Sequence, residues 1–231
     1  MKLDWSQVPM YNTVMSVAAG AALLSIVWLG WQLQRKKPVH YEGTAMNFAA
    51  LGLILTITGA HMSLTWPLGL IAAYDNIIFG EPSLAFGVLL LVGAVLLWRQ
   101  RTQEQDAARA GIARAVHPLA IFIIGMGLAL GAIAFAGLTF QLFAAPPEEP
   151  ISGAFAEWPW VEAIFMSGLF GVTGIGAIFF PFAAAQLAES TERTVVQRIT
   201  GITLGLTGLG FLLFGAMNFF THVGLIVNTS A

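Results

Sequence analysis

Six long apolar stretches dominate the sequence and constrain the fold more than any other feature. A helix that crosses a bilayer needs about 20 apolar residues, within a range of roughly 17–25. The predicted spans are about 11–31, 45–66, 84–98, 118–143, 161–184 and 201–222. The third span is short, and because Pro82 lies just before it, a start nearer Ile77 is an alternative.

The composition excludes a water-soluble fold. Of the 231 residues, 57% are hydrophobic and 10% are charged, which is more apolar surface than a soluble domain of this size can bury. We predict an all-α polytopic membrane protein, a bundle of six transmembrane helices in a single domain over 1–231. The lipid bilayer is then its main surrounding, and a net charge of −2 leaves no basic field for nucleic acid.

The basic residues predict the orientation. Nine of the ten fall after spans one, three and five: Arg35, Lys36, Lys37, Arg99, Arg101, Arg109, Arg114, Arg193 and Arg198. The positive-inside rule makes that side cytoplasmic, so both termini are expected outside. The seven tryptophans fall near the predicted span ends, where indole rings prefer to lie.

Two absences narrow the chemistry. The chain has no cysteine, which excludes disulfides, thiolate metal sites and iron–sulfur clusters. It also contains no nucleophile elbow, phosphate-binding loop or dinucleotide fingerprint. The sequence therefore leans away from an enzyme without deciding the point.

The predicted outer face carries the candidate polar site. Its members are His61, Asp75, Glu81, Glu157, Glu162 and His222. Imidazoles and carboxylates together suit a divalent cation such as Zn²⁺ or Mn²⁺, or a proton relay. No tight ligand spacing occurs, so the identity of any metal stays open. We hypothesise that His61 and Glu81 approach each other, and expect Glu148 and Glu149 to be solvated.

A bis-histidine haem b is an alternative cofactor. His40 and His117 lie just before spans two and four at the inner face, and His61 and His222 lie near the outer face. Two such pairs would suit a transmembrane electron carrier. Against this, His40 and His61 are 21 residues apart, about 31 Å along a helix, so the two haems would be far apart.

Glycines inside the spans predict close helix packing. Gly127 and Gly131 form one small-xxx-small pair, and Gly201 and Gly205 form another. Such pairs let two helix backbones approach closely in lipid. They indicate packing within the bundle or, alternatively, a face for a homo-oligomer.

Two neighbouring segments carry a family resemblance. Residues 59–68 read GAHMSLTWPL, and residues 76–87 read NIIFGEPSLAFG. Together they resemble a signature of domain-of-unknown-function family 981, multi-pass membrane proteins of bacteria and archaea. The resemblance implies a prokaryotic plasma-membrane protein and no particular activity.

Four functions stay open, and a membrane enzyme is the least favoured of them because the sequence shows no catalytic constellation. The sequence favours an accessory or scaffold subunit of a membrane complex, working with a membrane-protein partner or as a homo-oligomer. The first alternative is a cation or small-solute binding or transport protein with the outward-facing His/Glu site. The second is the bis-histidine haem b electron carrier.

Overall fold

The computed structural model describes residue 5, residues 8–187 and residues 192–230. Over these residues the chain forms helices and no strands. The elements are α1 (Asn12–Gln34), α2 (Tyr41–Thr65), α3 (Ala73–Asp75), η2 (Asn76–Gly80), α4 (Glu81–Gln100), α5 (Gln105–Val116), η3 (His117–Leu119), α6 (Ala120–Thr139), η4 (Ser152–Phe155), α7 (Pro159–Ala185) and α8 (Val195–Thr229).

Six helical stretches in the described chain are long and apolar enough to cross a membrane. They are Asn12–Gln34, Tyr41–Thr65, Ala73–Gln100, Gln105–Thr139, Pro159–Ala185 and Val195–Thr229. The predicted all-α bundle of six spans is therefore confirmed, and the protein is a membrane protein. The predicted boundaries differ most at the third, fourth and sixth spans, and the fourth stretch starts early because it includes α5 and η3 ahead of α6.

The third helical stretch begins at Ala73 rather than near Leu84. A proline ring clashes with the carbonyl four residues earlier and supplies no N–H. Pro82 would meet the carbonyl of Ile78 in this way, and the chain accommodates it by forming a π-helix over Asn76–Gly80. The stretch therefore continues through the proline instead of starting after it.

The sixth stretch also exceeds its prediction, because its start is capped outside the apolar run. The Thr194 side chain accepts a hydrogen bond from the Gln197 N–H, and the Gln197 side-chain oxygen accepts one from the Thr194 N–H. This capping box begins α8 at Val195 instead of Gly201.

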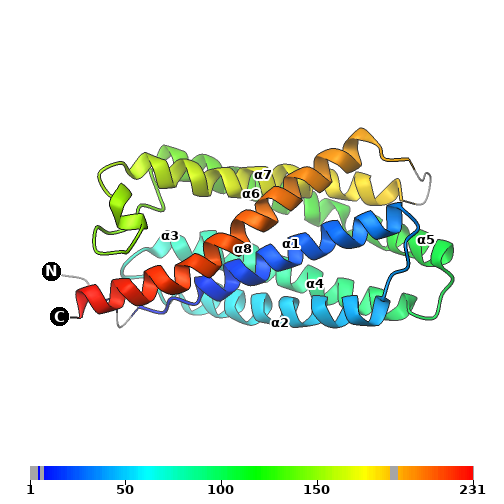
Figure 1. Ribbon diagram of the computed structural model, residues 1–231, viewed down its shortest axis with the longest axis horizontal. Helices are drawn as coiled ribbons and strands as arrows, with labels where there is room; N and C mark the ends of the chain where they lie inside the picture. Colours follow the sequence, from blue (N-terminus) through cyan, green and yellow to red (C-terminus); the bar gives the residue numbers. More distant parts are fainter. Residues whose placement is uncertain (1–4, 6–7, 188–191, 231) are drawn as a thin grey trace.

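The helices pack as three antiparallel pairs (Figure 1). The α6/α7 pair lies along the top of the view, the α2/α4 pair lies along the bottom, and α1/α8 crosses between them in front. α1 packs on α2 and α8 packs on α7, so the third pair joins the other two.

Glycines allow the close approach within each pair. A Cβ built at Gly87 of α4 would lie 2.5 Å from the Thr56 amide nitrogen of α2. One built at Gly127 of α6 would lie 2.8 Å from the Gly174 carbonyl oxygen of α7. Gly127 therefore packs inside the bundle. At Gly131 and at the Gly201/Gly205 pair, a Cβ would meet no described atom within 4 Å.

The two ends of the bundle differ in charge. The basic end is formed by residues 35–40, 99–117 and 192–198, and the acidic end by residues 61–81, 144–162 and 218–230. α1 begins and α8 ends at the acidic end (Figure 1). The positive-inside rule predicts that the basic end is cytoplasmic, and this orientation stays a prediction.

Candidate functional site

A large cavity lies between α1, α4, α6, α7 and α8. Its volume is about 1280 Å³. Its lining runs from Asn12 and Asn218 at the acidic end to Arg35 and Arg198 at the basic end. The 23 residues of α1 extend about 35 Å, so the cavity follows the bundle through a thickness comparable to the roughly 30 Å of a bilayer's hydrocarbon core.

Aromatic side chains form the middle of the cavity wall. The Phe170 ring lies 5.7 Å from the Phe211 ring and 6.2 Å from the Phe79 ring, measured between centroids. All three residues line the cavity, and Phe79 belongs to the π-helix η2. The π-helix forced by Pro82 therefore contributes directly to the wall.

Two valines of α4 belong to the cavity wall and are well exposed. Val92 and Val95 line it, yet they are 44% and 61% exposed. α4 and α6 both border the cavity, and they touch each other only sparsely. This side would face lipid when the bundle lies in a membrane.

Neutral polar groups mark the acidic end of the cavity. Ser16 donates a hydrogen bond to the Phe211 carbonyl at 2.8 Å. Asn218 is buried, and its Oδ1 atom has no hydrogen-bond partner within the described chain. This end therefore offers an acceptor whose hydrogen-bonding capacity is unused.

Charged groups of one sign mark the basic end of the cavity. Four arginines line it: Arg35, Arg99, Arg193 and Arg198. No aspartate or glutamate among the described residues lines it. The only charges on the described wall are therefore positive.

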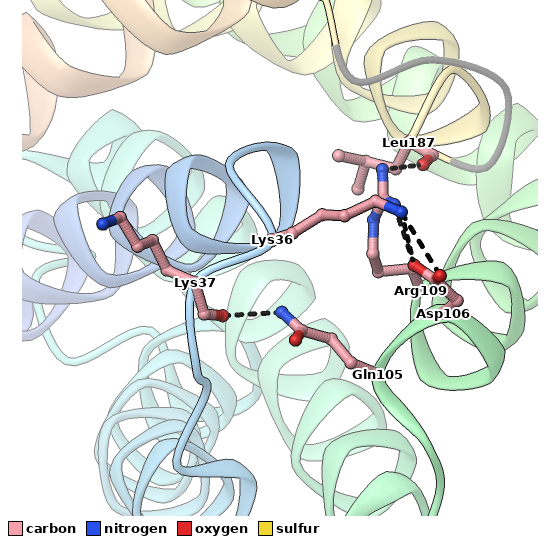
Figure 2. Close-up of polar contacts among 6 residues, drawn as sticks. All are labelled: Lys36, Lys37, Gln105, Asp106, Arg109 and Leu187. Atoms are coloured by element: carbon pink, nitrogen blue, oxygen red, sulfur yellow. Dashed lines mark hydrogen bonds and ion pairs between the residues drawn. The ribbon is translucent and has the colours of Figure 1, made fainter.

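A separate polar network joins three helices at the basic end (Figure 2). The Lys36 ammonium, just beyond α1, lies 3.2 Å from Asp106 Oδ2 of α5. Arg109 Nη1 lies 3.2 Å from Asp106 Oδ1, and its Nη2 donates to the Leu187 carbonyl at 2.6 Å, just beyond α7. Gln105 Nε2 donates to the Lys37 carbonyl at 2.7 Å. The network holds α5 across the end of the bundle.

Within the described chain, no hydrogen bond or ion pair joins the predicted outer residues to one another. His61 is exposed, and its Nδ1 lies 2.9 Å from the Tyr11 hydroxyl. Glu81 and Glu157 are exposed, and Asp75 is partly buried. No hydrogen bond or ion pair joins His61 to Glu81 within the described residues. Their proposed approach stays a prediction.

The structure does bring together His222 and two carboxylates at the acidic end. Glu149 Oε1 lies 3.8 Å from His222 Nε2, and the Glu149 carboxylate is close enough to Glu162 for the two charges to interact. Glu162 accepts a hydrogen bond from the Ala145 N–H. Burial raises the pKa of the Glu149 carboxyl, and the neighbouring Thr221 hydroxyl lowers it to a smaller extent.

The expectation that Glu149 is solvated was wrong, because Glu149 is only 8% exposed. The proline-rich segment folds back onto α8, where Pro150 contacts Gly224, and this buries Glu149. Glu148 is exposed, as expected. The four prolines of the segment were the available signal for a folded loop, although they did not indicate where it docks.

The histidines predicted at the inner face have local surroundings. His40 Nδ1 accepts a hydrogen bond from the Gly43 N–H at 2.9 Å and so caps α2. His117 is exposed in η3. Across 8–187 and 192–230, no three His, Asp or Glu side chains converge to hold a metal ion. A divalent cation and the haem pairs stay predictions.

The cavity was missed by sequence reasoning. Its aromatic residues read as general core or lipid-facing groups, and its arginines read only as topology signals. The residues that form the cavity wall are far apart in the chain, so no local pattern in the sequence predicts the cavity.

An all-helical chain with six apolar helices and a bilayer-length cavity defines a polytopic membrane protein. The chain belongs to the family described as "Protein of unknown function (DUF981)", whose family model matches residues 10–224. This confirms the resemblance seen in residues 59–68 and 76–87. Comparison with curated proteins and with solved structures found no match.

Proposed function

We propose that this membrane protein binds an amphipathic, lipid-like molecule in its internal cavity. We place it in the plasma membrane of a prokaryote, with both termini outside. The observation that carries the proposal is the cavity itself, about 1280 Å³ in volume and apolar in its middle. Ordinary small-molecule pockets measure about 300–1,000 Å³, so this one exceeds the size that a compact solute needs.

The shape and chemistry of the cavity favour a hydrocarbon chain. Protein interiors are close-packed, and an unfilled apolar volume forfeits dispersion contacts. Water gains few hydrogen bonds against a wall of leucine and phenylalanine. An acyl or isoprenoid chain supplies the missing contacts, and the exposed side beside α4 gives it a path from the bilayer.

An accessory role in a membrane complex is the second candidate. One observation favours it: only 11% of the apolar window in Gln105–Thr139 is buried, the lowest share among the six stretches of the described chain. Gly125 and Gly131 on α6 have no described atom within 4 Å of a built Cβ. This face of α6 is open to a partner helix or to lipid.

The test is native mass spectrometry of the protein extracted in a mild neutral detergent. The spectrum reports both retained lipid and any partner polypeptide. We expect roughly one lipid-like molecule per chain to survive delipidation. In the double variant Ala85→Phe/Ala177→Phe, whose two sites line the cavity, this retention should be lost.

Ala132→Phe is the matched control, since Ala132 is exposed on α6 and does not line the cavity. It should retain lipid as the wild type does. The single variant Ala177→Phe serves if the double variant fails to fold. Equal retention in cavity and control variants would overturn the proposal. A second polypeptide at fixed stoichiometry, with no cavity-dependent lipid, would establish the accessory role instead.

A further inference from the structure

We infer that the cavity selects an anionic amphiphile, whose negatively charged headgroup lies at the basic end among Arg35, Arg99, Arg193 and Arg198. This inference rests on the proposed function and names the class of ligand. The occupant is a membrane lipid with a phosphate-bearing headgroup and apolar tails, taken from the leaflet at the basic end.

The first support is the convergence of the four arginines. Arg35 caps the C-terminus of α1, and Arg99 lies in the last turn of α4. Arg193 and Arg198 flank the N-terminus of α8. Three helix ends, separate in sequence, therefore each contribute arginines to the lining at the basic end of one cavity.

The second support is that no carboxylate in the described part of the chain forms an ion pair with these arginines. In the described chain, ion pairs with carboxylates engage other basic residues, namely Lys36, Arg101 and Arg109. None of the four cavity arginines forms one, and no described carboxylate lines the wall. The cavity mouth is therefore electropositive, which favours an anion from outside the chain.

The third support comes from the helix dipoles. A helix C-terminus carries partial negative charge, which partly balances Arg35 and Arg99. The N-terminus of α8 carries partial positive charge, which adds to that of Arg193 and Arg198. Arg193 and Arg198 therefore stand in the more positive field, and we expect them to contribute more to anion binding.

Guanidinium chemistry favours a headgroup with oxyanion oxygens, and a phosphate meets that requirement. Arginine donates two parallel hydrogen bonds to phosphate or carboxylate oxygens, and it is the residue favoured for such recognition. The glutamine side chains of Gln100 and Gln103 also line this end and supply neutral donors. A phosphodiester with an apolar tail matches both the charged mouth and the aromatic middle.

The test compares phosphatidylglycerol with phosphatidylcholine of identical chains, added to delipidated protein in neutral detergent. We expect phosphatidylglycerol to bind about tenfold more tightly, the factor that corresponds to one charge-assisted hydrogen bond. This preference should shrink as salt is raised. The variant Arg193→Gln/Arg198→Gln should lose it, and Arg35→Gln/Arg99→Gln should lose less.

The matched control is Lys37→Gln/Arg114→Gln. Both residues are exposed at the basic end, and neither lines the cavity. The control removes the same charge and should keep the preference. If it loses as much as the cavity variant, general surface charge explains binding and the inference is wrong.

Further outcomes separate the inference from the function on which it rests. Equal binding of the two lipids, abolished by Ala85→Phe/Ala177→Phe, would overturn the anionic headgroup and leave the lipid cavity standing. Lipid binding that is unchanged in the cavity variants would overturn both the anionic headgroup and the lipid cavity. Stabilisation by inorganic phosphate alone, equal to that by phosphatidylglycerol, would establish a free-anion site and overturn the lipid assignment.

Discussion

The two ends of the bundle use their charged residues in different ways. At the basic end, one set of charges is locked into the network of Lys36, Asp106 and Arg109, and a second set faces the cavity without a carboxylate partner. At the acidic end, a carboxyl group is buried beside His222. Basic residues at the same end therefore have two roles. Some form ion pairs that hold helices together, and others form a candidate ligand site, and the neighbours of each residue determine which role it has.

The largest effect on stability is expected from the polar network of Arg109 at the basic end. Arg109 is only 6% exposed, and its guanidinium holds the Leu187 carbonyl. In Arg109→Met we expect a loss of about 2–3 kcal/mol in the free energy of unfolding, because that carbonyl loses a charged donor. Asp106 is itself well exposed and is rehydrated, so it adds little. The measurement is chemical unfolding in mixed micelles.

Arg114→Met on the same helix is the control, since Arg114 is exposed. Its free energy of unfolding should stay within about 0.5 kcal/mol of the wild type. A loss in Arg114→Met as large as that in Arg109→Met would mean that net charge, and not the buried contact, stabilises this end.

The acidic end should instead respond to pH. The folded-state pKa of Glu149 is raised by burial above its unfolded value. Its stabilising contribution is therefore fully present below the unfolded pKa, about 4.3, and is lost as the pH rises through the folded pKa. Stability should fall over this window in the wild type. Glu149→Gln, which stays neutral, should flatten the fall.

Thermal unfolding measured between pH 4 and pH 8 checks this expectation. Glu148→Gln is the matched control, because Glu148 is the exposed neighbour. The same pH slope in the wild type and Glu149→Gln would contradict the assignment. The titratable groups that face Glu149 are His222 at 3.8 Å and Glu162.

The smallest effect is expected at the exposed surface of the acidic end. The Tyr11 hydroxyl lies 2.9 Å from His61 Nδ1, and this contact is open to solvent. Water replaces such a hydrogen bond readily, so Tyr11→Phe should cost about 0.5 kcal/mol or less. Tyr74→Phe, which removes another exposed phenol, is the comparison. A loss above about 2 kcal/mol in Tyr11→Phe would show that His61 belongs to a tighter site.

The architecture was predictable because it depends on local composition. Apolar runs of bilayer length must be helical, since backbone polar groups in lipid require partners within the segment. The spans therefore follow from residue type and length alone. The π-helix did not follow in the same way. Pro82 signals a disturbance, but residue type alone does not say whether the helix ends there or continues as a π-helix. The burial of Asn76 in that π-helix, and its hydrogen bond from the Leu68 N–H, are seen only in the structure.

The candidate sites were less predictable, for a reason that Glu149 illustrates. The sequence Glu148-Glu149 between prolines looks uniformly solvated, but the folded loop buries one carboxylate and exposes the other. The outer candidates Glu81 and Glu157 are expected on the same membrane face as His61, and all three are exposed, with no hydrogen bond or ion pair joining them in the described chain. Residues at the same depth in the membrane share one spatial coordinate, whereas the residues of a site must lie close together in all three dimensions.

By itself, the sequence determined that this protein is an all-helical membrane protein with six spans and a strongly basic side. Those properties follow from the local composition of each segment, and a segment in lipid must satisfy its own backbone hydrogen bonds by forming a helix. Only the tertiary structure decided that the helices enclose a cavity, that Arg109 donates a hydrogen bond to the Leu187 carbonyl, and that Arg193 and Arg198 line the basic end of the cavity. A cavity or an ion pair depends on which residues, distant in sequence, meet in space. An arginine in the sequence therefore predicts only topology, and it becomes a candidate ligand once its neighbours in the fold are known.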